Sequence, residues 1–249
     1  RAEYARVSTE NPLMYAEARQ RLAASYQEAD RPDLALAEAR RAFEADPTNA
    51  AAAYNLAAVY TEQERYAEAL EILDGPTLNT ARQPWPVRFQ RGAVYESMGR
   101  NDQAEAELWA ALQSEPNDPQ ILNYLGYMWV DHGTRVDQGA EMIARAVDAE
   151  PTSGHYQDSL GWARYRQGRF EEAVPILELA VSLEPANAEI NDHLGDAYWQ
   201  VGREREARFQ WERVLALSPG DARQAEVERK LAQGLDRLAP SPTAAAPVA

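Results

Sequence analysis

The chain of 249 residues contains no cysteine, only three histidines and a single lysine, Lys230. The absence of cysteine excludes disulfide bonds, thiolate zinc sites and a cysteine nucleophile, and it is compatible with oxidising and reducing compartments alike. No uninterrupted apolar run approaches the roughly 18 residues that a membrane-spanning helix needs. The sequence therefore predicts no direct insertion into a membrane.

Positive charge is scarce, since 25 Lys+Arg stand against 40 Asp+Glu and give a formal net charge of −15. A field of that sign repels phosphate, so we expect no nucleic-acid partner and no docking on an anionic membrane. Hydrophobic residues make up 45% of the chain, and the six Trp and twelve Tyr add large side chains. This composition is sufficient for a folded core, in one large domain or in an array of smaller units.

The sequence repeats with a period of 34 or 35 residues over residues 16–49, 50–84, 85–118, 119–153, 154–187 and 188–221. The eighth place of every block holds a small residue: Ala23, Ala57, Gly92, Gly126, Gly161 and Gly195. The twentieth place does so too: Ala35, Ala69, Ala104, Gly139, Ala173 and Ala207. Small residues at two fixed places allow two helices to cross closely, with larger side chains filling the space beside the contact.

Glycine and proline mark where the helices of each block end. Glycine recurs at place fifteen as Gly99, Gly133, Gly168 and Gly202. A left-handed residue closes a helix at that place with the least steric cost when it is glycine. A proline near the end of most blocks cannot continue the second helix. Each block is therefore predicted to be a helix of about fourteen residues, a tight turn and a second such helix.

This pattern resembles the tetratricopeptide repeat, a 34-residue helical hairpin, over residues 16–221. The resemblance implies an all-α, right-handed superhelical solenoid of six hairpins, with residues 222–238 as a C-terminal capping helix. The tryptophan that is usual at the fourth place of the family is missing from every block. Asp74-Gly75-Pro76 and the prolines that follow predict a shortened helix and an irregular connection over residues 74–86, which we expect to be a joint in the array.

The two ends differ from the repeats. Residues 1–15 are expected to be the remnant of a preceding helix or a linker. Because the sequence begins at Arg1 without an initiator methionine, we expect a mature or excised form whose natural chain extends upstream. Residues 239–249 are rich in alanine and proline and are expected to be disordered.

The candidate binding residues lie on the first helices of the last three blocks, where periodicity places one row of side chains on the concave wall of the array. That row is aromatic and acidic there, and it is small and smooth in the earlier blocks. It predicts a groove for a protein or an extended peptide with basic and apolar residues. The groove residues are Asn123, Tyr127, Asp158, Trp162, Tyr165, Asp192, Asp196 and Trp199. The alternative is that these aromatics only fill the space between neighbouring helices.

A second resemblance concerns residues 119–221. Segments such as Asn123-Tyr124-Leu125-Gly126-Tyr127 and Asp158-Ser159-Leu160-Gly161-Trp162 resemble bacterial envelope repeat proteins. These include lipoprotein adaptors that bring substrates to a carboxyl-terminal processing protease. The resemblance implies a periplasmic or envelope location, although the residues leave a cytoplasmic one open.

No residue pattern predicts catalysis, a cofactor or a metal. His155 and His193 with Asp158 and Asp192 could hold zinc only if all four converged, which helical geometry does not require. Ser159 adjoins Asp158 on a helix, so the two side chains point about 100° apart and do not form a hydrolytic triad with His155. We therefore expect a non-catalytic scaffold or adaptor. The alternatives are a self-associating structural array, or a regulatory domain of a larger protein whose function lies upstream.

Overall fold

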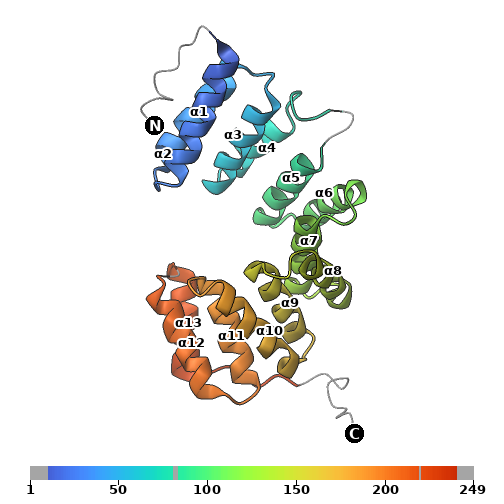
Figure 1. Ribbon diagram of the computed structural model, residues 1–249, viewed down its shortest axis with the longest axis vertical. Coiled ribbons are helices and arrows are strands. Elements are labelled where there is room, and N and C mark those ends of the chain that lie inside the picture. The colour runs from blue at the N-terminus through green and yellow to red at the C-terminus, as the bar shows by residue number, and fades with distance from the viewer. Residues whose placement is uncertain (1–10, 81–83, 219, 240–249) are drawn as a thin grey trace. The chain divides into compact units, whose positions relative to one another are not determined.

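The structure is a computed structural model that describes residues 11–80, 84–218 and 220–239 (Figure 1). In these residues it contains thirteen α-helices and no strand. The prediction of an all-α repeat solenoid is confirmed. The chain divides into two compact units with their boundary between Glu115 and Pro116. The expectations for residues 1–10 and 240–249 fall outside the described residues, whereas residues 12–15, expected to belong to a preceding remnant or linker, form the start of the first helix, Pro12–Gln27.

Each unit is a row of antiparallel helical hairpins. The helices of the first unit are α1 (Pro12–Gln27), α2 (Pro32–Ala45), α3 (Ala50–Glu62), α4 (Tyr66–Leu73), α5 (Trp85–Ser97) and α6 (Asn101–Ser114). Those of the second unit are α7 (Pro119–Asp131), α8 (Val136–Ala149), α9 (Gly154–Arg166), α10 (Phe170–Leu183), α11 (Ala188–Gln200), α12 (Glu204–Ala216) and α13 (Asp221–Gln233).

The small residues lie where the two helices of a hairpin touch, as predicted. A Cβ atom on Gly126 of α7 would lie 2.8 Å from the backbone oxygen of Gly139 on α8. A Cβ atom on Gly161 would lie 2.5 Å from Leu177, and one on Gly195 would lie 2.5 Å from Trp211. A larger residue at these places would therefore force the hairpins apart.

The ends of the helices follow a repeated scheme. A side-chain oxygen of Asn11, Asn49, Asp118, Ser153 or Asn187 caps the start of α1, α3, α7, α9 or α11. The predicted left-handed glycines close four first helices, with φ between 67° and 82°. An arginine then precedes each second helix and stacks on a ring of the first helix in four hairpins. The pairs are Arg65 with Tyr60, Arg100 with Tyr95, Arg135 with Trp129 and Arg203 with Tyr198.

The second helix of the second hairpin is short, but the connection that follows it is not the boundary between the two units. Helix α4 has only eight residues, as the sequence predicts. The joint expected over residues 74–86 is wrong, because the boundary lies at Glu115. Leu78 in the connection is buried and packs with Leu73 and Val87 in one hydrophobic cluster. This packing holds residues 74–80, the described part of the connection after α4, against the core of the first unit.

The last helix differs in length from the predicted one. Helix α13 ends at Gln233, and Gly234 follows with φ at 74°, whereas we expected the helix to reach residue 238. Val227 of α13 is fully buried, and Leu231 and Leu235 pack against the core that contains Trp199 and Trp211. None of the helices over the described ranges is long and apolar enough to cross a membrane.

Candidate functional site on the first helices of the second unit

A pocket of about 430 Å³ opens among the first helices of the second unit and α13. Its volume lies within the range of about 300–1,000 Å³ that is usual for ligand pockets. Helices α7, α9, α11 and α13 all contribute to its lining. The lining residues are Tyr127, Asp131, Trp162, Glu189, Asp192, His193, Asp196, Ala222, Arg223, Glu226 and Lys230. Four of the eight residues predicted from the sequence are among them: Tyr127, Trp162, Asp192 and Asp196.

Two further predicted residues belong to the core rather than to an open groove. Tyr165 stacks on Trp162 at 4.7 Å between ring centroids and meets Phe170 edge-on. The indole nitrogen Nε1 of Trp199 donates a 2.6 Å hydrogen bond to the carbonyl oxygen of Leu235. Both Tyr165 and Trp199 are buried, and neither lines the pocket. For them the space-filling alternative describes the structure.

Asp158 is buried beside the pocket and holds one of its lining residues. Both of its carboxylate oxygens lie 3.0 Å from Nδ1 of His193. Burial disfavours the charged imidazole, but the attraction of Asp158 outweighs it and raises the pKa of His193 above its ordinary value. The His193 ring also stacks on Trp162 at 4.2 Å between centroids. Asp158 therefore orients His193, which lines the pocket, and does not line the pocket itself. Asn123 is half-buried on α7 and does not line the pocket.

Lys230 from α13 enters the wall of α11 and pairs with two buried carboxylates. Its Nζ atom lies 2.8 Å from Asp192 and 2.9 Å from Asp196, and the residue is only 2% exposed. Asp196 also accepts a 3.0 Å hydrogen bond from Nε1 of Trp211. Burial raises the pKa of Asp196 to about 6, although the Lys230 ammonium opposes that effect. The wall of this pocket thus already binds one cation.

The pocket carries an excess of negative charge. Five carboxylates line it, against the cations Arg223 and Lys230 in the lining and Arg166, which lies 3.6 Å from Asp131. Three of the five carboxylates are about half-exposed and form the rim, and their exposed fractions are 50%, 49% and 53%. They are Asp131, Glu189 and Glu226. Acidic groups around a low-dielectric hollow attract cations from solution.

The sequence reasoning missed the contribution of α13. One further block of 34 residues after Ala188 would begin at Ala222, which places Glu226 fifth and Lys230 ninth. These are the places that face the groove in the earlier blocks. The period therefore contained the signal, whereas the amphipathic pattern of residues 222–238 indicates only a cover.

The residues weighed for catalysis and for zinc have other partners. His155 lies 3.1 Å from Glu184, and its side chain is 67% exposed. The hydroxyl of Ser159 donates to the backbone oxygen of His155, 3.0 Å away, and not to an imidazole. Within residues 11–80, 84–218 and 220–239, no three His, Asp or Glu side chains are grouped to hold a metal ion.

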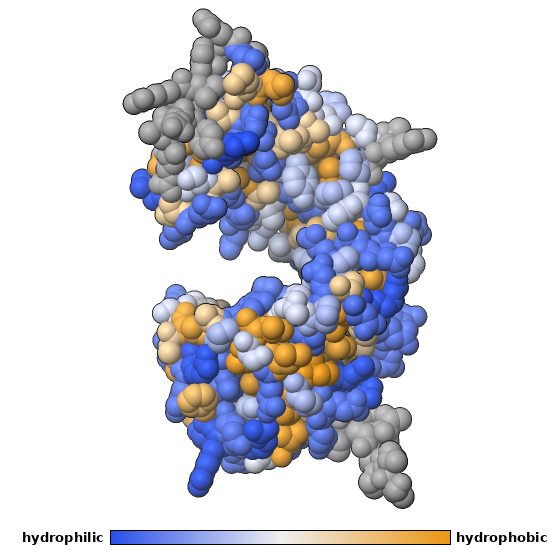
Figure 2. Space-filling view, in the orientation of Figure 1, coloured by the Kyte–Doolittle hydropathy of each residue, from blue (hydrophilic) through white to orange (hydrophobic). Residues whose placement is uncertain are grey.

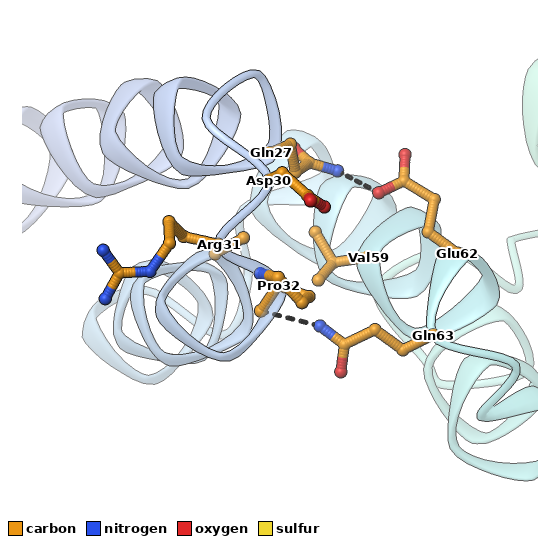
Figure 3. A pocket seen from close by; sticks show the side chains of 8 residues that line it. Gln27, Asp30, Arg31, Pro32, Val59, Glu62 and Gln63 are labelled. Atoms are coloured by element: carbon orange, nitrogen blue, oxygen red, sulfur yellow. Dashed lines mark hydrogen bonds between the residues drawn. The ribbon is translucent and has the colours of Figure 1, made fainter. Parts of the chain in front are cut away.

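A smaller pocket of about 190 Å³ lies in the first unit, between the turn after α1 and the end of α3 (Figure 3). Figure 3 shows that Gln27 points toward Glu62, and the side-chain amide of Gln63 donates to the carbonyl oxygen of Pro32. These hydrogen bonds join neighbouring hairpins across the hollow. We interpret it as a gap between hairpins and assign it no ligand.

Comparison with known proteins agrees with the geometry. A family model described as tetratricopeptide repeat matches residues 14–85 and 164–231, and a second model with that description matches residues 89–154. A TPR repeat-containing protein of Pseudomonas aeruginosa is 38% identical over 76 residues, which are 30% of this chain and 13% of that protein. The chain thus spans a small part of the length of this curated relative.

Two solved structures show the same fold at low identity. The Cut9–Hcn1 hetero-tetramer of the APC/C has a TM-score of 0.75 at 16% identity, over 89% of this chain and 43% of that one. YrrB, described as a TPR protein with an unusual peptide-binding site, has a TM-score of 0.50 at 20% identity, over 74% of this chain and 91% of that one.

Proposed function

Because the chain belongs to the tetratricopeptide repeat family, we propose that it is a non-catalytic scaffold that binds a partner protein in the pocket of its second unit. Proteins of this family generally mediate protein–protein interaction, and their folds are typically non-catalytic. The observation that carries the proposal is the pocket itself, in which Tyr127 and Trp162 stand beside an excess of carboxylates.

The partner is an extended segment with basic and apolar residues. The rim carboxylates Asp131, Glu189 and Glu226 attract Lys or Arg side chains, while Tyr127 and Trp162 offer apolar surface. The chain itself supports this chemistry, since Lys230 is held by Asp192 and Asp196 of the same wall. The net charge of −15 favours fast encounter with a basic segment.

A random peptide library displayed on phage and selected on the immobilised chain tests this function. We expect enrichment of peptides that carry Arg or Lys next to an aromatic or aliphatic residue. Binding of the enriched peptides should fall at least tenfold for Trp162→Ala and for Glu189→Arg, as measured by calorimetry.

Glu212→Arg is the matched control, because Glu212 is an exposed carboxylate on α12 outside the pocket. It makes the same change of charge and should leave binding within about twofold. If the library gave no enriched motif, or if peptides bound the Glu189→Arg and Glu212→Arg variants equally, the pocket would not be the binding site.

We infer a narrower role from the resemblance of residues 119–221 to envelope adaptor proteins. In this role the chain works in the bacterial envelope and delivers the bound partner to a carboxyl-terminal processing protease. The test is the rate at which such a protease cleaves a substrate that carries an enriched peptide. An increase with the unaltered chain, absent with Glu189→Arg, supports delivery, and an unchanged rate contradicts it.

Exposed apolar side chains on the second helices favour a second function, self-association. Leu179 and Leu183 of α10 are 44% and 36% exposed, and Phe209 of α12 is 56% exposed. Figure 2 shows hydrophobic residues gathered over α10 and α11 on the face that it draws. A mass that rises with concentration and returns to that of a monomer in Leu179→Glu/Phe209→Glu would support this function. A constant monomer mass would exclude it.

A further inference from the structure

Helix α13 contacts the rest of the second unit in the way that a bound ligand contacts a protein. Only two of its side chains, Val227 and Lys230, are fully buried. Lysine is almost never buried without a partner, and here its ammonium is enclosed by Asp192 and Asp196. The surface under α13 therefore discriminates by charge as well as by shape.

The residues after α13 continue this contact through the backbone as well as through the side chains of Leu235 and Arg237. The carbonyl oxygens of Leu235 and Asp236 accept hydrogen bonds from Trp199 and Gln200 at 2.6 and 2.9 Å. The amide of Leu238 donates to the side chain of Gln200 at 2.9 Å. Such bonds do not depend on side-chain identity, so any extended segment can make them.

The attachment of α13 suits reversible release. Ser218 and Gly220, just before the helix, both have positive φ, at 54° and 82°. The residue at the start of α13, Gly220, has no side chain with which to cap the helix. A buried ion pair adds specificity more readily than net stability, because desolvation offsets much of its attraction. The last described helix is held by two fully buried side chains, by Leu231 and Leu235 against the core and by polar contacts, so we expect it to open more easily than α11.

We propose that residues 221–238 are a resident occupant of a docking surface on α11 and α12, and that this surface binds a partner helix with a lysine among aliphatic residues. The occupant supplies the pattern: Val227 stands three residues before Lys230, and Leu231 and Leu235 stand one and five residues after it. A partner segment of this pattern displaces α13 and places its own lysine between Asp192 and Asp196. This inference rests on the proposed protein-binding function and adds a second mode of binding, in which the partner helix replaces the residues Arg223, Glu226 and Lys230 that α13 contributes to the pocket.

Gly234 offers a way to release the occupant without changing the surface. A Cβ atom on Gly234 would lie 2.1 Å from Cζ2 of Trp199, so Gly234→Ala forces the segment off the indole. Gly202→Ala is the matched control, because Gly202 also has positive φ, at 82°, but a Cβ atom there would meet nothing within 4 Å. Both variants keep Asp192, Asp196 and Lys230.

The probe is a fluorescent synthetic peptide of residues 221–238, titrated against the full chain by anisotropy. We expect weak binding to the unaltered chain, because its own copy competes, and at least tenfold tighter binding to Gly234→Ala. Gly202→Ala should bind like the unaltered chain. The Lys230→Met peptide should bind Gly234→Ala at least tenfold more weakly, while an Arg229→Met peptide should bind as the original does.

Absence of peptide binding to Gly234→Ala would overturn the proposal when circular dichroism shows that the variant is folded. Equal binding of the Lys230→Met and Arg229→Met peptides would overturn it as well. Should Gly234→Ala fail to fold, hydrogen exchange of the unaltered chain decides: exchange in α13 much faster than in α11 supports release, and equal protection contradicts it. The library selection on the pocket is independent of these results, so the two proposals fail separately.

Discussion

Lys230 and Asp196 are 34 residues apart, one repeat length, and their charged groups lie 2.9 Å from each other. A separation of 35 residues, one more than the repeat length here, brings His193 at place six next to Asp158 at place five of the block before it. Residues at equivalent or adjacent places of successive first helices therefore meet. At place nine, Asp196 and Lys230 stand where the first three blocks have alanine. Their buried charges, with those of Asp158 and His193, make the free energy of unfolding of the second unit depend on pH.

The first prediction concerns pH. The pKa of His193 is raised in the folded state. Its stabilising contribution to the free energy of unfolding is therefore fully present below the ordinary pKa of 6.5, and it is lost as the pH rises through the folded-state pKa. Asp196 binds a proton more tightly in the folded state, with a pKa of about 6 against an ordinary 3.8, so its effect also falls as the pH rises through that window. We expect the free energy of unfolding of the second unit to rise by about 1–2 kcal/mol from about pH 8 to about pH 5.

Urea unfolding at several pH values measures this dependence. Asp196→Asn and His193→Gln should each flatten it. Below about pH 4.5 the lowered pKa of Glu206, which accepts a hydrogen bond from Arg203, opposes this trend. A free energy of unfolding that stays constant or decreases when the pH is lowered from about 8 to about 5 would show that the buried pairs are not charged as described.

The second prediction compares two glycines at the helix crossings. Gly126→Ala places a Cβ atom 2.8 Å from a backbone oxygen that cannot move aside, so we expect a loss of about 1–3 kcal/mol. Gly92→Ala meets Cγ of the buried Leu108 at 2.7 Å and the backbone oxygen of Ala104 at 3.3 Å, so its closest neighbour is a side chain that can shift. We expect a loss smaller than that of Gly126→Ala, because both variants gain about 1 kcal/mol in helix propensity and only Gly126→Ala meets a fixed backbone atom below 3 Å. Equal losses in thermal unfolding would contradict the account.

The third prediction restores a missing ring. Place eleven holds an aromatic residue under the turn arginine in most hairpins, but the fifth has Arg164 beside Arg169. Burial and the charge of Arg169 both lower the pKa of Arg164. Arg164→Tyr should raise the free energy of unfolding by about 0.5–1 kcal/mol, as in the stacked pair of Tyr198 and Arg203. Arg164→Gln removes only the repulsion, so the difference between the two variants measures the stacking.

The fourth prediction tests the connection after α4. Leu78 is 3% exposed and packs in the core of the first unit. Leu78→Ala should cost about 2–5 kcal/mol, which is typical of a buried leucine. The exposed Leu183 provides the control, and Leu183→Ala should cost far less. A small effect at Leu78 would restore the interpretation of this segment as a joint.

The hairpins could be predicted from the sequence because their determinants are local. Gly126 and Gly139 fix a crossing, and Gly133 fixes a turn, wherever the rest of the chain lies. The burial of Trp199 could not be predicted in the same way. Periodicity places a side chain on one face of a helix, but it does not state what covers that face. The cover comes from Gly234 and Leu235, whose approach depends on a left-handed residue after α13.

The candidate site shows the same limit. Tyr127, Trp162, Asp192 and Asp196 are predictable because they repeat with the period and face one side. Lys230 is not predictable as their partner when its helix is considered only as a cover with an apolar face. The available signal is the period, which puts Lys230 at the ninth place of a further block, and the two carboxylates that it meets are seen only in the structure.

Amide hydrogen exchange with and without a library-selected peptide tests the central claim most directly. If the pocket is the binding site, protection will rise in α7, α9 and α11, and α8, α10 and α12 will change little. The Glu189→Arg variant will lose that protection, and the Glu212→Arg variant will keep it. Protection confined to the second helices, or to the first unit, would contradict the claim and move the binding surface elsewhere.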